Sequence, residues 1–431
     1  MAFVVNFAKN VRNHWKKSTF AAALITYGAS YANDKIKINN LMREYCLEAS
    51  VSGKHTAPVT QTPKHVIVLL NPAANRRSAE DTFKEYCEPI LHLAGYLVNI
   101  VKTDSEGHAR RYVEELTSFP SAIVVAGGDG TLSEVVTGVL RRAESNESCP
   151  IGILPVGRTN ASSGEARRKL NRVEEARQLA EAAISIVRGN VSKRHVMKIE
   201  VVSEEEEEHR RPVYAVGSFQ WGAFRDILSL RDQYWYTGSL REYVAFFVNA
   251  FSSRPTWECD AHIRYTPPCS GCRNCGATEK KINTHGGKWW SGFLPRTTVS
   301  TAPVRDFSKV VNEMCTKEFN VKAKHSEITV ETSSASTETG SLQMKLSDLE
   351  DSSFSFILKS WKRLRGDSAA FNTLQAPIEA RTVEILPDAE VNPQKEKYYS
   401  IDNEDYDVKP IKITLLPYAI NMFSLGTSQK L

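Results

Sequence analysis

The stretch Val124-Val-Ala-Gly-Gly-Asp-Gly-Thr-Leu-Ser-Glu134 decides the fold, because it joins an apolar strand directly to an amphipathic helix. Apolar residues from Leu132 to Leu140 recur at i, i+3, i+4, i+7 and i+8, which predicts the helix. The sequence predicts the strand of this stretch over 122–126, further strands over 66–70, 97–101 and 151–154, and helices over 109–116 and 172–187. Alternating strands and helices predict a largely parallel sheet with helices on both faces.

The turn inside this stretch indicates a phosphate-binding site. It contains three glycines, Gly127, Gly128 and Gly130. They let the backbone adopt positive φ and approach a ligand, and the following helix presents amide groups and a positive dipole end. Thr131 is expected to cap this helix. Asp129 would lie beside phosphate oxygens, so Mg²⁺ is implied between them. No P-loop motif occurs, and Ser133 replaces the third glycine of the dinucleotide fingerprint. A plain tight turn is the alternative.

Length and composition limit the possible classes of protein. The 431 residues predict two or three domains. A hydrophobic fraction of 41% and a charged fraction of 24% exclude collagen, global disorder and a polytopic membrane protein. The net charge is +5, but residues 1–33 carry four basic and no acidic residues, which leaves +1 for the remainder. A body so close to neutral gives no electrostatic reason to expect nucleic acid as a partner.

Residues 1–60 are expected to form a targeting or membrane-associating segment and a linker. A basic leader without acids is typical of mitochondrial targeting. The apolar run from Phe20 to Ala32 has 13 residues, whereas a bilayer span needs about 20. The run is therefore expected to lie at a membrane interface or to span with help from neighbouring residues. A helix buried in the protein's own core is the alternative.

The sequence divides after this leader into an α/β nucleotide-binding domain over 61–194 and a β-rich, sandwich-like domain over 195–431. Period-two alternation predicts the second domain, as at Val383/Ile385 and Ile411/Ile413. Disordered loops are expected near 203–211 and 331–355. The apolar stretch Tyr243–Phe251 is expected to be a buried helix or strand, or alternatively a lipid-contacting wall.

Four of the eight cysteines cluster in the second domain. Cys269, Cys272 and Cys275 form a C-x₂-C-x₂-C pattern, and Cys259, His262 or His285 is available as a fourth ligand. Structural Zn²⁺, a disulfide and reduced thiols are the three alternatives.

The motifs together resemble the diacylglycerol kinase catalytic-domain family of lipid kinases. The resemblance is carried by Gly127-Gly-Asp-Gly-Thr131, Asn71-Pro72, Thr103-Asp-Ser-Glu-Gly-His-Ala109, Leu154-Pro-Val-Gly-Arg-Thr-Asn160 and Ile401-Asp-Asn-Glu404. Within that family the chain is similar to the acylglycerol kinases, on Asn13–Lys17, Pro89–Leu93, Val136–Arg142, Trp221–Asp226 and Ser400–Asp407. A soluble NAD kinase shares the glycine turn, but the apolar leader and the Trp221–Asp226 block disfavour it.

The resemblance implies an enzyme that uses ATP and Mg²⁺ to phosphorylate mono- and diacylglycerol. It implies that the nucleotide is held by Asn71, Thr103, Gly127, Gly128, Gly130, Thr131, Glu134, Gly157, Arg158, Thr159 and Arg241. Asp129, Asp402 and Glu404 are the implied catalytic residues, with Asp402 as general base and with Asp129 and Glu404 near the metal. Asn403 replaces the glycine of the family's DGE motif, and asparagine tolerates the left-handed backbone that this position needs.

The resemblance also implies a location and a second role. Acylglycerol kinases of animals act at the mitochondrial inner membrane, facing the intermembrane space, where they are also subunits of the carrier-import translocase. That role would use the N-terminal segment and a protein-binding surface, and the two roles can coexist.

Overall fold

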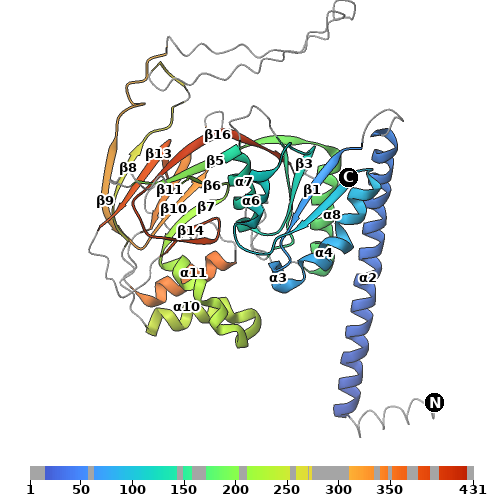
Figure 1. Cartoon of the computed structure of the whole chain (residues 1–431). Coiled ribbons are helices and arrows are strands. Elements are labelled where there is room, and N and C mark those ends of the chain that lie inside the picture. The colour runs from blue at the N-terminus through green and yellow to red at the C-terminus, as the bar shows by residue number, and fades with distance from the viewer. Residues whose placement is uncertain are drawn as a thin grey trace, which may run out of the picture. The chain divides into compact units, whose positions relative to one another are not determined.

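The computed structural model describes most of the chain, in two compact units (Figure 1). The described residues are 15–56, 63–142, 149–157, 171–202, 211–252, 259–269, 271–273, 310–333, 340–347, 352–365, 377–388 and 398–424. Unit 1 is formed by Met1–Lys193 with Ile420–Leu431, and unit 2 by Arg194–Ala419.

A parallel sheet forms the centre of unit 1, as predicted. Its strands are β2 (Leu97–Lys102), β1 (His65–Leu70), β3 (Ala122–Ala126) and β4 (Ile151–Leu154), in that order. Val66 pairs with Val98 on one side and with Ala122 on the other. All five residues of β3 are buried, because helices cover both faces of a sheet of this kind. The end of β16 (Ile411–Phe423) continues the sheet, where Met422 pairs with Ile151.

The helices of unit 1 follow the predicted order. They are α3 (Ala74–Arg77), α4 (Ala79–Tyr86), α5 (Glu88–Leu93), α6 (His108–Glu115), α7 (Asp129–Arg142) and α8 (Arg172–Arg188). The helical pattern around Pro89 is divided at Cys87 into α4 and α5. Helix α8 begins where the Asn171 side chain accepts the Glu174 amide, and it ends at Gly189 with φ of 73°. Each end of α8 therefore carries a residue type that suits its capping position.

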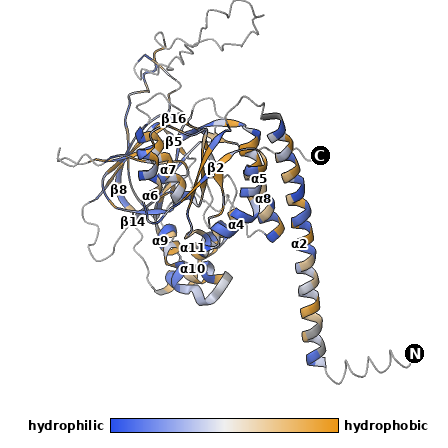
Figure 2. Ribbon diagram, turned by 45° about the vertical axis from the view of Figure 1, so that its right-hand side comes forward, coloured by the Kyte–Doolittle hydropathy of each residue, from blue (hydrophilic) through white to orange (hydrophobic). Residues whose placement is uncertain are grey.

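A 42-residue helix, α2 (Trp15–Thr56), precedes the sheet. Its C-terminal half packs on unit 1, where Leu41 and Ala49 join the core and Glu48 pairs with Arg188 at 2.8 Å. Its N-terminal half extends away from the rest of unit 1 (Figure 1) and exposes aromatic and aliphatic residues such as Phe20 and Ile25. Hydrophobic and hydrophilic residues are mixed along it (Figure 2). Among the described helices, none combines the length and the apolarity needed to cross a bilayer.

Two antiparallel sheets form unit 2, which confirms the β-rich second domain. One contains β16, β13 (Thr382–Pro387), β8 (Cys259–Thr266) and β9 (Phe319–His325). In addition, β5 (Val191–Val201) pairs with β16, and β6 (Val213–Ala215) pairs with β5. The other runs β12 (Ile378–Ala380), β11 (Leu342–Ser347), β10 (Glu327–Thr332), β7 (Ser218–Gly222), β14 (Tyr398–Ile401) and β15 (Glu404–Asp407). Ile413 and Val383 from the first sheet share one core with Trp221 and Val330 from the second.

Four helices of unit 2 build a smaller core of their own. They are α9 (Ala223–Ser229), the 3₁₀ segment η2 (Leu230–Leu240), α10 (Arg241–Ser252) and α11 (Ser353–Leu364). Phe224 stacks on Phe246 at a centroid distance of 5.0 Å. The apolar stretch Tyr243–Phe251 is thus a helix, with Ala245 and Phe246 buried but Phe247 and Phe251 exposed.

Two predicted boundaries are wrong. Residues 420–431 were assigned to the second domain, yet they belong to unit 1, because the end of β16 pairs with β4. The expected loop over 331–355 contains β11, which pairs with β10, and the start of α11. The alternation of Leu342, Met344 and Leu346 outweighs the polar composition around it. Residues 203–210 lie outside the described part of the chain.

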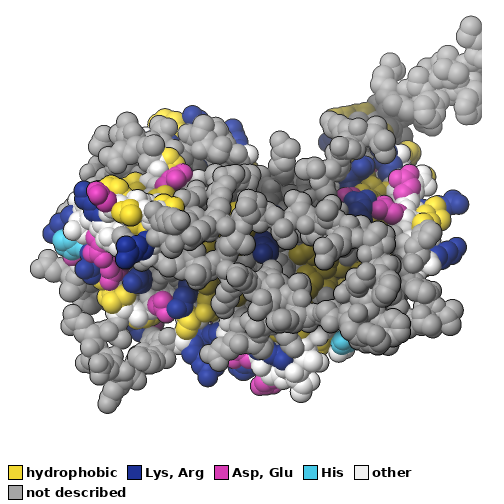
Figure 3. Space-filling view, turned by 90° about the horizontal axis from the view of Figure 1, so that it is seen from above, with side chains coloured by type: hydrophobic (Ala, Val, Ile, Leu, Met, Phe, Trp, Pro, Cys, Tyr) yellow, Lys and Arg dark blue, Asp and Glu magenta, His cyan; other side chains and the backbone are white. Residues whose placement is uncertain are grey.

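On the face seen in Figure 3, basic and acidic side chains of the described residues are interspersed.

Candidate functional site

The glycine turn connects β3 to α7 in unit 1 and is held by its neighbours on both sides. The Asn71 amide donates to the Ala126 carbonyl at 3.0 Å, and the Gly157 amide donates to the Gly127 carbonyl at 3.1 Å. A Cβ on Gly157 would lie 2.5 Å from the Gly128 Cα. None of the three turn glycines has a positive φ, so that expectation is wrong. Glycine is needed here because two backbone segments approach closely.

Asn71 ties the loop after β1 to the first turn of α7. Its Nδ2 donates to Thr131 Oγ1 at 3.2 Å, while its Oδ1 accepts the Ala73 amide at 3.0 Å. Helix α7 begins at Asp129, so Thr131 lies within the first turn and not at the predicted cap position. A Cβ on Gly127 would lie 2.8 Å from Thr131 Oγ1, which explains the small residue there. Asn71, Gly127 and Thr131, all predicted from motifs, are therefore brought together.

Asp129 is the first residue of α7, and only 2% of its surface is exposed. Its negative charge at the positive end of the helix dipole is electrostatically favourable. The first i→i−4 bond of the helix runs from the Leu132 amide to the Gly128 carbonyl at 3.1 Å, so the amides of Gly130 and Thr131 precede it. Amide donors beside a carboxylate are a donor set that fits a phosphate chain with a bound Mg²⁺.

Glu134 lies one turn further along α7, and its carboxylate holds the start of α6. One oxygen accepts the Gly107 amide at 2.8 Å, and the other accepts the amides of Ala109 at 3.1 Å and Arg110 at 3.4 Å. The resemblance had implied that Glu134 faces the nucleotide. In the structure it acts as a cap for the segment that carries Gly107, which has φ of 75°.

Thr103, another predicted nucleotide residue, lies in the loop at the end of a strand. It follows β2, and its amide donates to the Leu70 carbonyl at 2.9 Å. This bond keeps the loops after β1 and β2 together. Arg158 and Thr159, also predicted, lie outside the described residues. The described residues before them end at Gly157, which packs on the glycine turn.

Asp402 belongs to unit 2, in the tight turn between β14 and β15. Its φ is 48° and that of Asn403 is 67°, the pattern of a type I′ hairpin turn, which asparagine tolerates. The carboxylate is buried and accepts three backbone amides of the β6–β7 turn, those of Val216, Gly217 and Ser218, each at 2.9 Å. Because Asp402 lies in this turn, residues 402–404 do not form an extended segment that would put Asp402 and Glu404 on the same face.

Arg225 anchors the same hairpin and was not singled out from the sequence. Its guanidinium forms ion pairs with Asp226, at 2.9 Å, and with Asp405 on β15. Only 7% of its side chain is exposed. Glu404, on the same strand, accepts the Tyr406 hydroxyl at 3.2 Å. The signal for Arg225 was its position inside the Trp221–Asp226 block, but sequence alone does not show its partner.

Arg241 begins α10 in unit 2. Its Nη1 lies 3.1 Å from an oxygen of Asp232 in η2, and 15% of its side chain is exposed. This pair holds the junction between η2 and α10. The phosphate contact that the resemblance implies stays a prediction.

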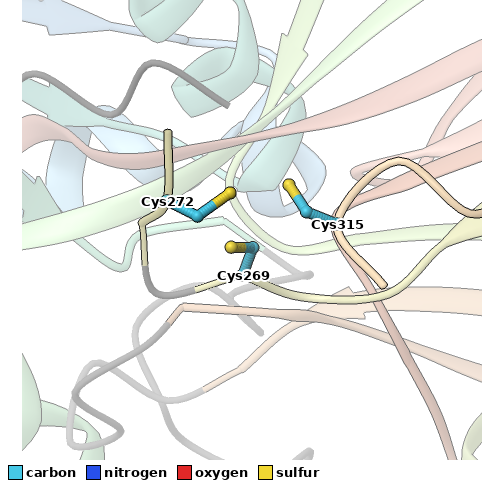
Figure 4. A group of neighbouring side chains, drawn as sticks. All are labelled: Cys269, Cys272 and Cys315. Atoms are coloured by element: carbon cyan, nitrogen blue, oxygen red, sulfur yellow. The ribbon is translucent and has the colours of Figure 1, made fainter. Parts of the chain in front are cut away.

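A three-cysteine cluster lies in unit 2 and differs from the predicted one. The Sγ atoms of Cys269, Cys272 and Cys315 all lie within 4.8 Å of one another (Figure 4). In the described part of the chain these cysteines are thiols and not disulfides. Cys275, the third predicted member, lies outside the described residues. Cys315 was not considered, since 42 residues separate it from Cys272.

Comparisons with known proteins match the two units in turn. Residues 65–199 match the model of the diacylglycerol kinase catalytic domain, and residues 216–430 match that of the acylglycerol kinase C-terminal region.

Whole-chain relatives agree with these matches. The mitochondrial acylglycerol kinase of Mus musculus is 32% identical, covering 97% of this chain and 96% of its own. The Homo sapiens protein of the same name is 30% identical over the same shares. A solved structure of a putative diacylglycerol kinase from Bacillus anthracis is 15% identical, with a TM-score of 0.49, and covers 85% of this chain and 98% of its own.

Proposed function

Because the chain belongs to the acylglycerol kinase family, and is thus a lipid kinase, we propose that it phosphorylates mono- and diacylglycerol. The phosphoryl donor is ATP with Mg²⁺, and the products are lysophosphatidic and phosphatidic acid. Such a transfer requires that the phosphates be positioned, that their charge be neutralised and that a hydroxyl proton be accepted.

The glycine turn of unit 1 is the observation that carries this proposal. The close packing of Gly157 on Gly128 leaves backbone amides, not side chains, at the start of α7. Those amides favour the phosphates of the nucleotide, and the buried Asp129 favours the cation that accompanies them. Asn71 keeps Thr131 in place, and Glu134 holds the neighbouring Gly107 segment at the same helix. Mg²⁺, when bound, neutralises charge on the transferred group.

Unit 2 supplies the carboxylate that accepts the proton of the substrate hydroxyl. We assign the general base to Asp402, which accepts the proton of the acylglycerol hydroxyl as attack begins. Glu404, two residues further on, supports the metal. Asp402 also holds the β6–β7 turn through three amide bonds, so one carboxylate has both a structural and a chemical task.

The helical part of unit 2 suits an enzyme whose substrate lies in a membrane. Trp235 and Tyr236 of η2 are 75% and 68% exposed, and Phe247 and Phe251 of α10 are 52% and 60% exposed. On α11, Phe354 and Leu358 share an exposed face with Lys362 at i+8. Aromatic and basic side chains together favour an anionic lipid surface. Lipid access through this surface therefore supports the proposed substrate class.

The experiment is the substitution Asp129→Asn. Asparagine has the same shape but no charge, so we expect the fold to survive and lipid phosphorylation with Mg-ATP to be lost. Asp81→Asn, in the exposed first turn of α4, is the matched control and keeps full turnover. Radiolabelled phosphate transfer to monoacylglycerol in mixed micelles measures activity, and thermal unfolding measures the fold. Wild-type turnover in Asp129→Asn would remove the catalytic assignment.

A second role is favoured by the exposed N-terminal half of α2. The relatives are named as mitochondrial, so we place this chain in mitochondria, at the inner membrane facing the intermembrane space. There, Phe20, Leu24 and Ile25 offer an apolar surface to the membrane or to subunits of the carrier-import translocase. An Asp129→Asn chain that restores carrier import in cells lacking the protein separates the roles. Failure of that chain to restore import would tie import to kinase activity.

A further inference from the structure

The three-cysteine cluster joins the two ends of one long excursion in unit 2. Cys269 and Cys272 follow β8, and Cys315 precedes β9 (Figure 4). These two strands are antiparallel neighbours, in which Tyr265 pairs with Phe319. The segment between the two strands, called the β8–β9 excursion, therefore has its two ends side by side, and the sulfur atoms meet there.

A backbone contact holds these two ends together independently of the sulfur atoms, because the Arg273 amide donates to the Val310 carbonyl at 2.9 Å. Within the second end, the Cys315 amide donates to the Asn312 carbonyl at 3.2 Å. Gly271 has φ of 124°, a conformation that lets the short C-x₂-C segment turn back on itself. The sulfur atoms are thus presented by two defined turns.

Two side chains donate to the sulfur atoms. Asn312 Nδ2 lies 3.3 Å from Cys269 Sγ, and Arg381 Nη1 lies 3.9 Å from Cys315 Sγ. The Arg381 amide donates to the Thr266 carbonyl at the end of β8, at 2.8 Å, so this residue is fixed by the sheet. Donors of this kind are the outer partners that metal-bound thiolates have in proteins.

The cluster differs from two other buried cysteines of the described residues. Cys87 and Cys259 pack inside the two large hydrophobic cores, as small apolar side chains do. Cys272 and Cys315 are 1% and 5% exposed but lie outside both of those cores. Packing in either large core therefore does not account for their burial.

We propose that the thiolates of Cys269, Cys272 and Cys315 bind one Zn²⁺, which fastens the base of the β8–β9 excursion. A tetrahedral zinc site has Zn–S bonds of about 2.3 Å, which places its sulfur atoms about 3.8 Å apart. The present separations, up to 4.8 Å, need a contraction of about 1 Å at most. This ligand set includes Cys315 in place of the predicted Cys275, and it does not depend on the proposed kinase activity.

The test measures zinc in the full chain, purified without chelators from zinc-supplemented cells. Mass spectrometry of the elements should find about one zinc per chain in the wild type, and less than about a tenth of that in Cys315→Ser. Cys259→Ala is the matched control, because Cys259, a possible fourth ligand on the sequence, packs in the hydrophobic core of unit 2 and not in the cluster. This variant should keep its zinc. Cobalt substituted into the wild type should show tetrahedral thiolate absorption.

A second variant keeps the inference testable if Cys315→Ser does not fold. Asn312→Ala removes the donor to Cys269 and also the acceptor of the Met314 amide, at 3.0 Å, while it leaves all three thiols in place. It should weaken zinc affinity by about 10- to 100-fold in a competition with a chromogenic chelator. Three results would each overturn the assignment: a wild-type chain without zinc, zinc retained in folded Cys315→Ser, or a disulfide between two of the three cysteines in the isolated protein.

Discussion

Replacing Asp402 with asparagine measures how much the hairpin turn depends on this carboxylate. In the structure, Oδ1 accepts the amides of Gly217 and Ser218, and Oδ2 accepts that of Val216. Asparagine keeps one acceptor oxygen and places an NH₂ group where the other oxygen was. Two amides can keep their bonds, and the third faces a donor.

The expected loss follows from these contacts. A hydrogen bond to a charged group contributes about 1.5–3 kcal/mol, and a buried donor without an acceptor costs about 1–3 kcal/mol. The full charge-assisted effect applies because Asp402 is only 2% exposed. The free energy of unfolding of unit 2 should therefore fall by about 3 kcal/mol. For a unit of this size, that corresponds to a fall in Tm of about 6–12 °C.

The assay combines thermal unfolding with lipid phosphorylation measured well below the transition. Asp407→Asn is the control, because it makes the same chemical change at an exposed position of the same hairpin. We expect Asp402→Asn to lower both Tm and turnover, and Asp407→Asn to lower neither. An unchanged Tm in Asp402→Asn would refute the structural reasoning. Full turnover of the folded variant would refute the base assignment.

Three further changes have defined outcomes. Gly157→Ala places a Cβ 2.5 Å from the Gly128 backbone, so it should lower stability by about 1–3 kcal/mol and raise the KM for ATP. Gly28→Ala is the control, because its Cβ would have nothing within 4 Å, and it should cause neither change. Unfolding curves and steady-state kinetics measure the two effects. Glu134→Gln removes a charged acceptor from the start of α6, and hydrogen exchange should show faster opening of those amides, a prediction that unchanged exchange would contradict. Burial, and to a smaller extent the nearby charge of Arg194, lower the pKa of His195 in the folded chain. His195 therefore takes up a proton more readily in the unfolded chain. Stability should therefore decline as the pH falls below about 6.5, and His195→Gln should lessen that decline in pH-dependent denaturation.

The parallel sheet could be predicted from the sequence because its strands are buried on both faces. Ala122–Ala126 and Ile151–Leu154 are apolar at almost every position, and the predicted bounds match those of β3 and β4. The glycine turn was identified for a related reason, since close backbone approach excludes larger side chains. Such local requirements restrict the residue types at the positions concerned, so they can be recognised in the sequence.

Contacts between distant segments could not be predicted in the same way. The three amides that reach Asp402 come from residues nearly 190 positions earlier, and backbone amides carry no residue-specific signal. From the sequence, Glu134 is predicted to be a helix residue near a phosphate site. In the structure, both of its carboxylate oxygens accept backbone amides at the start of α6. Cys315 stands alone in the sequence, so only the pairing of β8 with β9 shows that it lies beside Cys269.

The crossing of β16 from one unit to the other has a consequence for biosynthesis. Met422 pairs with Ile151, and the Ser424 amide donates to the Asn190 carbonyl at 2.9 Å, so the parallel sheet of unit 1 lacks its last strand until translation is nearly finished. The first half of the chain is therefore synthesised before the strand that pairs with it, which is encoded more than two hundred codons later. A premature stop codon near the end of the message would remove that strand and damage unit 1, most of which is encoded far upstream.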